Sequence, residues 1–520
     1  MKFQNYITFY LISFSVLFFV SKFQSAPGYM DADYYLMTGG RLANGLGFTE
    51  EVLWNFLDDP SGLPHPSHAY WMPLPTLIAA TGIKLLGKLE LPMFETGKIL
   101  FILIAATISP LTVALTWKLS SEKRLAFFSG ALAIFPGFYL AFLSTTDTFA
   151  LSMVLGAVFF FLIEYTTNEM NLPICLFLLG VVAGLLHLNR AEGFIWIAIA
   201  TASLILGRNA WRQVLWIISG YALIMAPWLL RNQISFGSLI PQGAFRTLWL
   251  TEYDQLFTYP ASQLSPNGWL ASGFAEIIQT RIESLWLNLQ TAVAVQGGIL
   301  LAPLIVLGAW RKRKIPAILW AGVAWVFLLL MMTVLFPFSG SRGGFFHAAA
   351  ALQPTLWALA AVGLNVLVGF GARKRGWRQN QAFSILGVGA VLILIGFSSF
   401  LIRERVVGDE SADPIWDDYF QRYETLGEAL ESLDLDADAV SMVNNPPGFN
   451  LATGLKAISV PNGDLDVSLE AARRYGASLL LLDENHPAGL DSLYSNPRNL
   501  RGLIYIESVS DTHIFQIALP

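Results

Sequence analysis

The chain has 520 residues, of which 54% are hydrophobic and only 13% are charged, and its mean hydropathy is +0.54. This composition excludes an ordinary soluble protein and predicts a polytopic membrane protein. The formal net charge is −5, and no nucleic-acid partner is expected. The single cysteine, Cys175, excludes an intramolecular disulfide and any metal site built from cysteines.

Apolar runs that can cross a bilayer, of about 20 residues each, predict an all-α polytopic membrane bundle of about 11 transmembrane helices. The first run follows a lone Lys2 and is not followed by a clear A-x-A cleavage site, so it is interpreted as an uncleaved first span. The runs lie near residues 6–20, 97–118, 125–143, 148–164, 172–188, 193–207, 214–230, 292–310, 316–337, 347–370 and 383–402.

Short basic loops set the expected orientation, because Lys and Arg collect on the cytoplasmic side of a membrane protein. Four such loops, at residues 118–124, 207–212, 311–314 and 372–378, share one face if the N-terminus is cytoplasmic. The outer face then receives the loop 21–96, the loop 231–290 and the tail 403–520. We therefore expect a multi-pass protein of the cell membrane.

The tail differs from the rest of the chain in charge and in pattern. Residues 403–520 hold 8 Lys and Arg against 20 Asp and Glu, a balance of −12, so the remainder carries +7. A helical opening is followed by short apolar runs bounded by Asn, Pro, Gly and Asp, which is typical of a small α/β domain. The sequence thus predicts a transmembrane domain over residues 1–402 and an extracytoplasmic α/β domain over residues 403–520.

The first outer loop carries an acidic pair directly after the first span. Asp31 and Asp33 are costly to keep beside hydrocarbon unless they are solvated or used. The stretch DADYYLMTGGRLANG predicts a short helix that ends at Asn44 and Gly45. From spacing alone, the two carboxylates could cap this helix, bind a metal or supply a general base.

Histidines in the same loop raise the question of a metal. His65 and His68, with Asp58 and Asp59 nearby, could bind a divalent cation, but P-H-P-S-H is loop sequence and implies no ligand geometry. We interpret this segment as a plain loop, so no cofactor and no metal ligand are assigned. A divalent metal stays an open alternative.

Further polar residues interrupt the apolar runs at their expected outer ends. Asp147 either caps the fourth span or belongs to a site, and Arg190 either pairs with Glu192 or binds a phosphate bidentately. Arg231 and Arg342 could each snorkel to the interface. Three arginines on one face beside acidic loops indicate a site for an anionic lipid.

In their order along the chain, these motifs resemble the type C glycosyltransferase superfamily. They are a first span, D-x-x-x-Y from Asp31 to Tyr35, an A/G-x-x-L-x-x-G stretch, W-x-P-L leading to L-L-G, and R-N-x-x-x-F-G after an A-P-W span. The branch that they resemble includes protein O-mannosyltransferases and bacterial aminoarabinose transferases of lipid A. The resemblance covers about residues 6–402.

The resemblance implies an inverting transfer of a sugar from a polyprenyl-phosphate donor to a glycan, lipid or protein acceptor at the outer face. It places Asp31 as the general base. The family usually has Asp-Glu here, whereas this chain has Asp31, Ala32 and Asp33, so the role could also fall to Asp33. The resemblance and the residues together give Tyr35, Asp147, Arg190, Arg231 and Arg342 as substrate-binding candidates.

Two other classes of function fit parts of the sequence. A lipid or solute transporter or flippase also uses intramembrane Arg and Asp, but it gathers them near the midplane rather than at one face. A non-catalytic envelope scaffold would use the outer domain to bind a partner.

Overall fold

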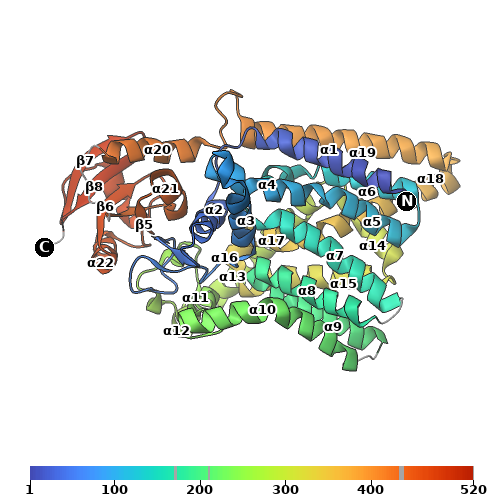
Figure 1. The fold of residues 1–520 in the computed structure, drawn as a ribbon, viewed down its shortest axis with the longest axis horizontal. Coiled ribbons are helices and arrows are strands. Elements are labelled where there is room, and N and C mark those ends of the chain that lie inside the picture. Colours follow the sequence, from blue (N-terminus) through green and yellow to red (C-terminus); the bar gives the residue numbers. More distant parts are fainter. Residues whose placement is uncertain (169–171, 209–210, 432–438, 519–520) are drawn as a thin grey trace.

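The computed structural model describes residues 1–168, 172–208, 211–431 and 439–518. It is an elongated molecule with a helical bundle at one end and a smaller mixed α/β region at the other (Figure 1). The N-terminus lies at the far end of the bundle, and the C-terminus lies in the α/β region.

The bundle is built from apolar helices, and the described residues contain seven that are long and apolar enough to cross a membrane. Each of the eleven predicted apolar runs corresponds to one or more helices. These helices are α1 (Phe3–Ser21), α4 (Met93–Ala106), α5 (Ile108–Ser120), α6 (Lys123–Ile134), α7 (Thr148–Asn168), α8 (Pro173–Asn189), α9 (Phe194–Arg208), α10 (Val214–Phe236), α14 (Ala302–Lys312), α15 (Pro316–Leu330), α18 (Gln353–Arg375) and α19 (Gln379–Ile402).

Hydrogen bonds bring three of the four basic loops to the same end of this bundle. Lys312 Nζ donates to the Leu119 carbonyl at 3.0 Å. Arg124 donates to Asn380 Oδ1 at 2.7 Å and to Asn365 Oδ1 at 2.9 Å. The segments at 118–124, 311–314 and 365–380 therefore meet, which agrees with the shared face expected from their charge.

The first outer loop forms a layer between the bundle and the α/β region (Figure 1). It contains α2 (Met30–Ala43), which begins and ends as its sequence predicts, and α3 (Leu74–Leu86). Three short strands lie between these helices: β1 (Thr49–Glu50), β2 (Val52–Leu53) and β3 (His65–Pro66). β1 and β3 pair in an antiparallel manner.

The second outer loop, predicted over 231–290, contains α11 (Gln242–Arg246), α12 (Pro266–Ala271) and α13 (Phe274–Thr291). The last of these buries polar Ser284 and Asn288 and exposes Leu285, Trp286 and Leu287. A helix that is polar inside and apolar outside suits contact with lipid rather than water. The short helices α16 (Pro337–Ser339) and α17 (Phe345–Ala348) follow α15.

A six-stranded mixed sheet organises the tail, as the pattern of short apolar runs predicts. Its order is β2-β5-β4-β6-β8-β7, so β2 of the first outer loop adds an edge strand to it, parallel to β5. The tail contributes α20 (Asp418–Glu431), β4 (Val440–Val443), α21 (Pro446–Thr453), β5 (Lys456–Ser459), α22 (Leu465–Tyr475), β6 (Ala477–Leu482), α23 (Asp491–Ser495), β7 (Leu503–Val509) and β8 (Thr512–Ile517). The first outer loop and the tail are therefore one structural unit.

Candidate active site

The helix α2 presents its two acidic residues in different directions. Both lie in its first turn, where carboxylates interact favourably with the helix dipole. Since an α-helix turns about 100° per residue, Asp31 and Asp33 lie about 200° apart around the axis. One can therefore face the bundle while the other faces the tail.

Asp31 lies beside two groups from the bundle. Ligand atoms of Asp31, Asp147 and His347 all lie within 4.8 Å of one another. His347 comes from α17, and its Nδ1 lies 3.7 Å from Asp147 Oδ2. Residues from three distant parts of the sequence thus form one cluster at the junction of the bundle and the first outer loop.

Asp147 is held firmly within this cluster. Its Oδ1 accepts a hydrogen bond from the backbone N–H of Thr148 at 2.5 Å, and its Oδ2 accepts one from the hydroxyl of Tyr29. Asp147 is only 1% exposed. It therefore caps α7 and belongs to the cluster at the same time, so the two interpretations of this residue are compatible.

Asp31, by contrast, makes no side-chain hydrogen bond with any residue that the structure describes, and it is only partly buried. Its pKa is raised to about 7, chiefly by burial and then by the charge of Asp147, while the charge of Arg190 opposes the rise. A carboxylate with a pKa near neutrality and with free oxygens can accept a proton from a substrate.

Asp33 is engaged elsewhere. Its side chain is fully buried and accepts hydrogen bonds from the hydroxyl of Tyr419 at 2.5 Å and from Asn445 Nδ2 at 2.9 Å. Its pKa is raised to about 7, because the effect of burial outweighs the lowering by these two hydrogen bonds. The carboxylate of Asp33 therefore binds the tail.

The three candidate arginines have different surroundings. Arg190 pairs with Glu192, as the local alternative predicted, yet its charge still acts on Asp31 and Tyr35. Arg342 is exposed, and its guanidinium lies 4.2 Å from the ring centroid of Tyr253. Burial raises the pKa of Tyr253, and so does the charge of Asp31, whereas the charge of Arg342 lowers this pKa. Tyr253 therefore links Arg342 to the cluster.

Arg231 is directed at the first outer loop. It donates hydrogen bonds to the carbonyls of Phe48 at 3.0 Å and Ser67 at 2.8 Å, and it lies over the ring of Trp228. These contacts fix the course of the loop.

Tyr35 is buried beside Asp31 and Asp147. Burial and the charges of both carboxylates raise its pKa. The structure therefore brings Asp31, Tyr35, Asp147 and Arg190 together. It adds His347 and Tyr29, which the sequence did not single out; His347 lies five residues after Arg342, and Tyr29 lies two residues before Asp31.

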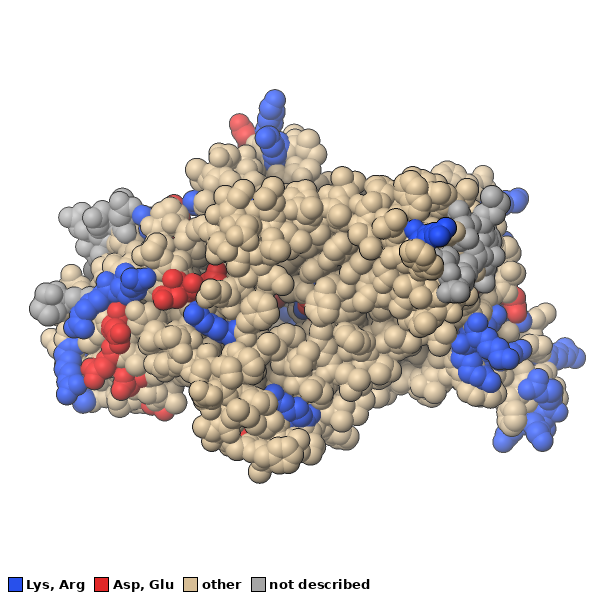
Figure 2. All heavy atoms as spheres, turned by 90° about the horizontal axis from the view of Figure 1, so that it is seen from below, with Lys and Arg blue, Asp and Glu red and all other residues tan. Residues whose placement is uncertain are grey.

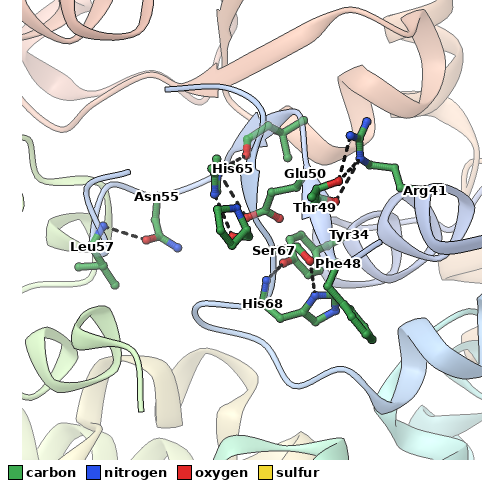
Figure 3. Close-up of polar contacts among 12 residues, drawn as sticks. Tyr34, Arg41, Phe48, Thr49, Glu50, Asn55, Leu57, His65, Ser67 and His68 are labelled. Atoms are coloured by element: carbon green, nitrogen blue, oxygen red, sulfur yellow. Dashed lines mark hydrogen bonds and ion pairs between the residues drawn. The ribbon is translucent and has the colours of Figure 1, made fainter. Parts of the chain in front are cut away.

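The histidines of the first outer loop serve a separate polar network (Figure 3). His65 Nε2 lies 3.5 Å from Glu50 Oε1 and 3.0 Å from the Val52 carbonyl. His68 contacts Ser67 Oγ at 2.7 Å and Thr76 Oγ1 at 2.9 Å. Both rings thus bond within the first outer loop, and the segment that was interpreted as a plain loop contains the strand β3 with His65.

A small cavity of about 20 Å³ lies beside Glu50. Its lining includes Trp54, Asn55, Asp58 and Tyr70, and Glu50 Oε2 has no hydrogen-bond partner among the described residues. A cavity of this size and polarity suits a buried water molecule.

No family model and no curated protein matches the sequence. In three dimensions the chain is similar to ArnT from Cupriavidus metallidurans bound to undecaprenyl phosphate, with a TM-score of 0.54 at 11% identity over 99% of this chain and 98% of that one. It is also similar to the archaeal oligosaccharyltransferase AglB from Archaeoglobus fulgidus in complex with an inhibitory peptide and a dolichol-phosphate. That match has a TM-score of 0.55 at 12% identity, over 93% of this chain and 70% of that one. A complex of the Archaeoglobus fulgidus oligosaccharyltransferase with Zn and sulfate gives a TM-score of 0.51 at 12% identity, over 91% of this chain and 68% of that one.

Proposed function

Because the chain has the fold of the type C glycosyltransferases, we propose that it transfers a sugar, with inversion, from a polyprenyl-phosphate donor to an acceptor at the outer face of the membrane. The observation that carries this proposal is the Asp31 carboxylate, which has no side-chain hydrogen bond among the described residues and is clustered with Asp147, His347 and the charge of Arg190. This arrangement combines a proton acceptor and a cation, which inverting sugar transfer requires.

In the proposed reaction, the acceptor hydroxyl oxygen forms a bond to the anomeric carbon while the bond from that carbon to the phosphate oxygen breaks. Asp31 takes the proton of the hydroxyl, and the polyprenyl phosphate leaves with the bonding electron pair. Asp147 is the alternative carboxylate in the cluster, but its hydrogen bonds from Thr148 and Tyr29 hold both of its oxygens. Asp31 is therefore the better base.

Arg190 and Arg342 are the proposed partners of the donor phosphate. Arg190 is half-buried next to the cluster, where a charge-assisted hydrogen bond is strong. Arg342 is exposed beside Tyr253 and Gly343, so it can move to meet a headgroup. We no longer assign Arg231 this role, since two loop carbonyls already occupy its guanidinium.

The cluster also fits a divalent cation. Two carboxylates and an imidazole with donor atoms within 4.8 Å match the ligands of Zn²⁺ or Mn²⁺. Asp31, Asp147 and His347 would hold such an ion, which would help to neutralise the phosphate. A bound cation would keep the carboxylate of Asp31 ionised at neutral pH.

We further propose eleven membrane spans, with the tail outside the cell. Four proposed spans correspond to helices that are shorter or interrupted, so they are not among the seven long apolar helices. These spans are residues 125–143, 172–188, 193–207 and 292–310. Figure 2 supports a membrane belt, because charged side chains gather toward the two ends of this face and leave an uncharged zone between them.

The experiment is sugar transfer by the purified full-length protein in detergent, using radiolabelled undecaprenyl-phosphate sugars and extracted envelope acceptors. Asp31→Asn keeps the size of the side chain but removes the base, so transfer should fall about 100-fold to 10,000-fold. Asp409→Asn is the matched control, since its carboxylate is fully exposed on the linker to the tail. It should transfer at the wild-type rate.

Two results would contradict the proposal. One is full activity of Asp31→Asn. The other is movement of the intact lipid-linked sugar across vesicles without any transfer, which would favour a flippase.

A further inference from the structure

The tail of this protein has the strand order of a ligand-binding α/β domain. Its parallel strands lie in the order β5-β4-β6, so the chain leaves β4 toward one neighbour and later returns to the other. In open α/β sheets, ligands bind outside the carboxyl ends of the strands at such a switch point. Here that position follows β4, at Asn445 and the start of α21.

The group that occupies this position is Asp33 of α2. Asn445 caps α21 by accepting a hydrogen bond from the Gly448 N–H at 3.1 Å, and its Nδ2 donates to Asp33 Oδ2 at 2.9 Å. Gly448 permits this close approach, because a Cβ atom there would lie 2.9 Å from Asp33 Oδ2. Tyr419 of α20 also donates a hydrogen bond, from its hydroxyl to the carboxylate of Asp33.

The linker before α20 holds the chain just ahead of α2 as well. Asp417 accepts hydrogen bonds from the backbone N–H groups of Ser25 and Ala26, at 3.0 Å and 2.8 Å. The Trp416 indole donates to the Ala26 carbonyl at 3.0 Å and packs on Gly28, where a Cβ atom would lie 2.1 Å from the ring. The entry to α2 and its Asp33 face are therefore both fixed by the tail.

We propose that Asp33 is a positioning residue, through which Tyr419 and Asn445 of the tail fix the rotation of α2 and thereby the direction of Asp31. This inference rests on the proposed function, since it assigns Asp31 as the base. Asp33 and Asp31 project about 200° apart from one rigid helix. Contacts that fix the orientation of Asp33 therefore also fix the direction of Asp31. A misplacement of about 1 Å in a reacting group can cost on the order of 100-fold in rate.

The first test is the pair of variants Asp33→Asn and Asp33→Asn/Asn445→Asp. In the single variant, the amide of residue 33 faces the amide of Asn445, so the hydrogen bond from an amide to a carboxylate is lost. The double variant restores an amide donor and a carboxylate acceptor, with their positions exchanged. Asp also caps helices well, so α21 keeps its cap. We expect kcat to fall on the order of 100-fold in the single variant, with the donor KM unchanged within about twofold, and to recover about tenfold or more in the double variant.

A second readout does not depend on transfer. Hydrogen exchange of the peptide spanning residues 30–43 should be faster in Asp33→Asn than in the wild type, and the double variant should slow it again. Unchanged exchange in Asp33→Asn would overturn the inference whether or not sugar transfer is observed.

The two hypotheses fail in different ways. Full activity of Asp31→Asn contradicts the proposed function. Loss in Asp31→Asn with full activity in Asp33→Asn contradicts only the positioning role, as does a failure of the exchanged pair to recover turnover. In an Asp31→Asn background, Asp33→Asn should cause no further loss of kcat, because the positioned group is already absent.

Discussion

At the scale of single residues, the difference between Asp31 and Asp33 lies in their partners rather than in their chemical type. Both carboxyls have a pKa raised to about 7 by burial, yet only Asp33 is satisfied by hydrogen bonds from the tail. Sequence spacing placed the acidic pair on one short helix. It could not separate the roles, because Tyr419 and Asn445 lie 386 and 412 residues away from Asp33.

The raised pKa of Asp31 predicts a pH-dependent rate. A general base works only in its ionised form, so kcat/KM should rise through an apparent pKa of about 7 and level off above it. The profile is measured with the wild type between about pH 5.5 and about pH 8.5. A rate that is constant over this range would contradict the role of Asp31.

Arg342 and Arg231 should contribute to different properties of the protein, the first to donor binding and the second to stability. Arg342→Met should raise the donor KM and leave the melting temperature unchanged, because this side chain is exposed. Arg231→Met should instead lower the unfolding free energy by about 2 kcal/mol or more, since charge-assisted hydrogen bonds to two carbonyls are lost. Donor kinetics and thermal unfolding of both variants distinguish the two roles. An Arg231→Met protein with normal stability would contradict the structural role of Arg231.

At the scale of elements, local patterns predicted α2 and the apolar helices well. The strand β2 could not be predicted in the same way, because its two residues pair with β5, about 400 positions later. The helix α13 was not predicted within the loop 231–290, because its polar residues are typical of a segment exposed to water. In the structure, however, this helix buries Ser284 and Asn288. Hydropathy reports composition, whereas the face on which each polar group lies depends on the neighbouring helices.

The strand β1 carries a carboxyl that should make stability depend on pH. Burial raises the pKa of Glu50 from 4.5 to about 8, and the Tyr34 hydroxyl and Arg231 only partly oppose this. The folded state thus holds this proton more tightly than the unfolded chain, so its contribution is present below pH 4.5 and lost as the pH rises through about 8.

Glu50→Gln removes this titration while keeping the shape of the side chain. The variant should therefore gain stability relative to the wild type as the pH rises from about 5 to about 8.5. Glu51→Gln, next to it but more exposed, is the matched control variant. Thermal unfolding across this range measures both, and a constant difference between Glu50→Gln and the wild type would contradict the assignment.

At the scale of the whole molecule, apolar runs were enough to predict the helical bundle, and the pattern of the tail was enough to predict its α/β character. They could not predict that the first outer loop and the tail share a sheet, since that depends on long-range pairing. The shared sheet couples topology to function, because α2 contacts both the bundle and the tail, so the site and the tail lie at the same end of the bundle. Orientation in the membrane is therefore a strong test of the whole proposal.

Cysteine labelling in intact cells tests this orientation. On a Cys175→Ala background, cysteines at the exposed positions Ser411 and Ser495 should react with a membrane-impermeant thiol reagent. A cysteine at exposed Gln381, at the start of α19 beside the basic loop 372–378, should react only after lysis. The opposite pattern would place Asp31 and the arginines on the cytoplasmic face. It would contradict the outer-face reaction, because the site and the tail cannot be separated without breaking the contacts of Asp33 with Tyr419 and Asn445.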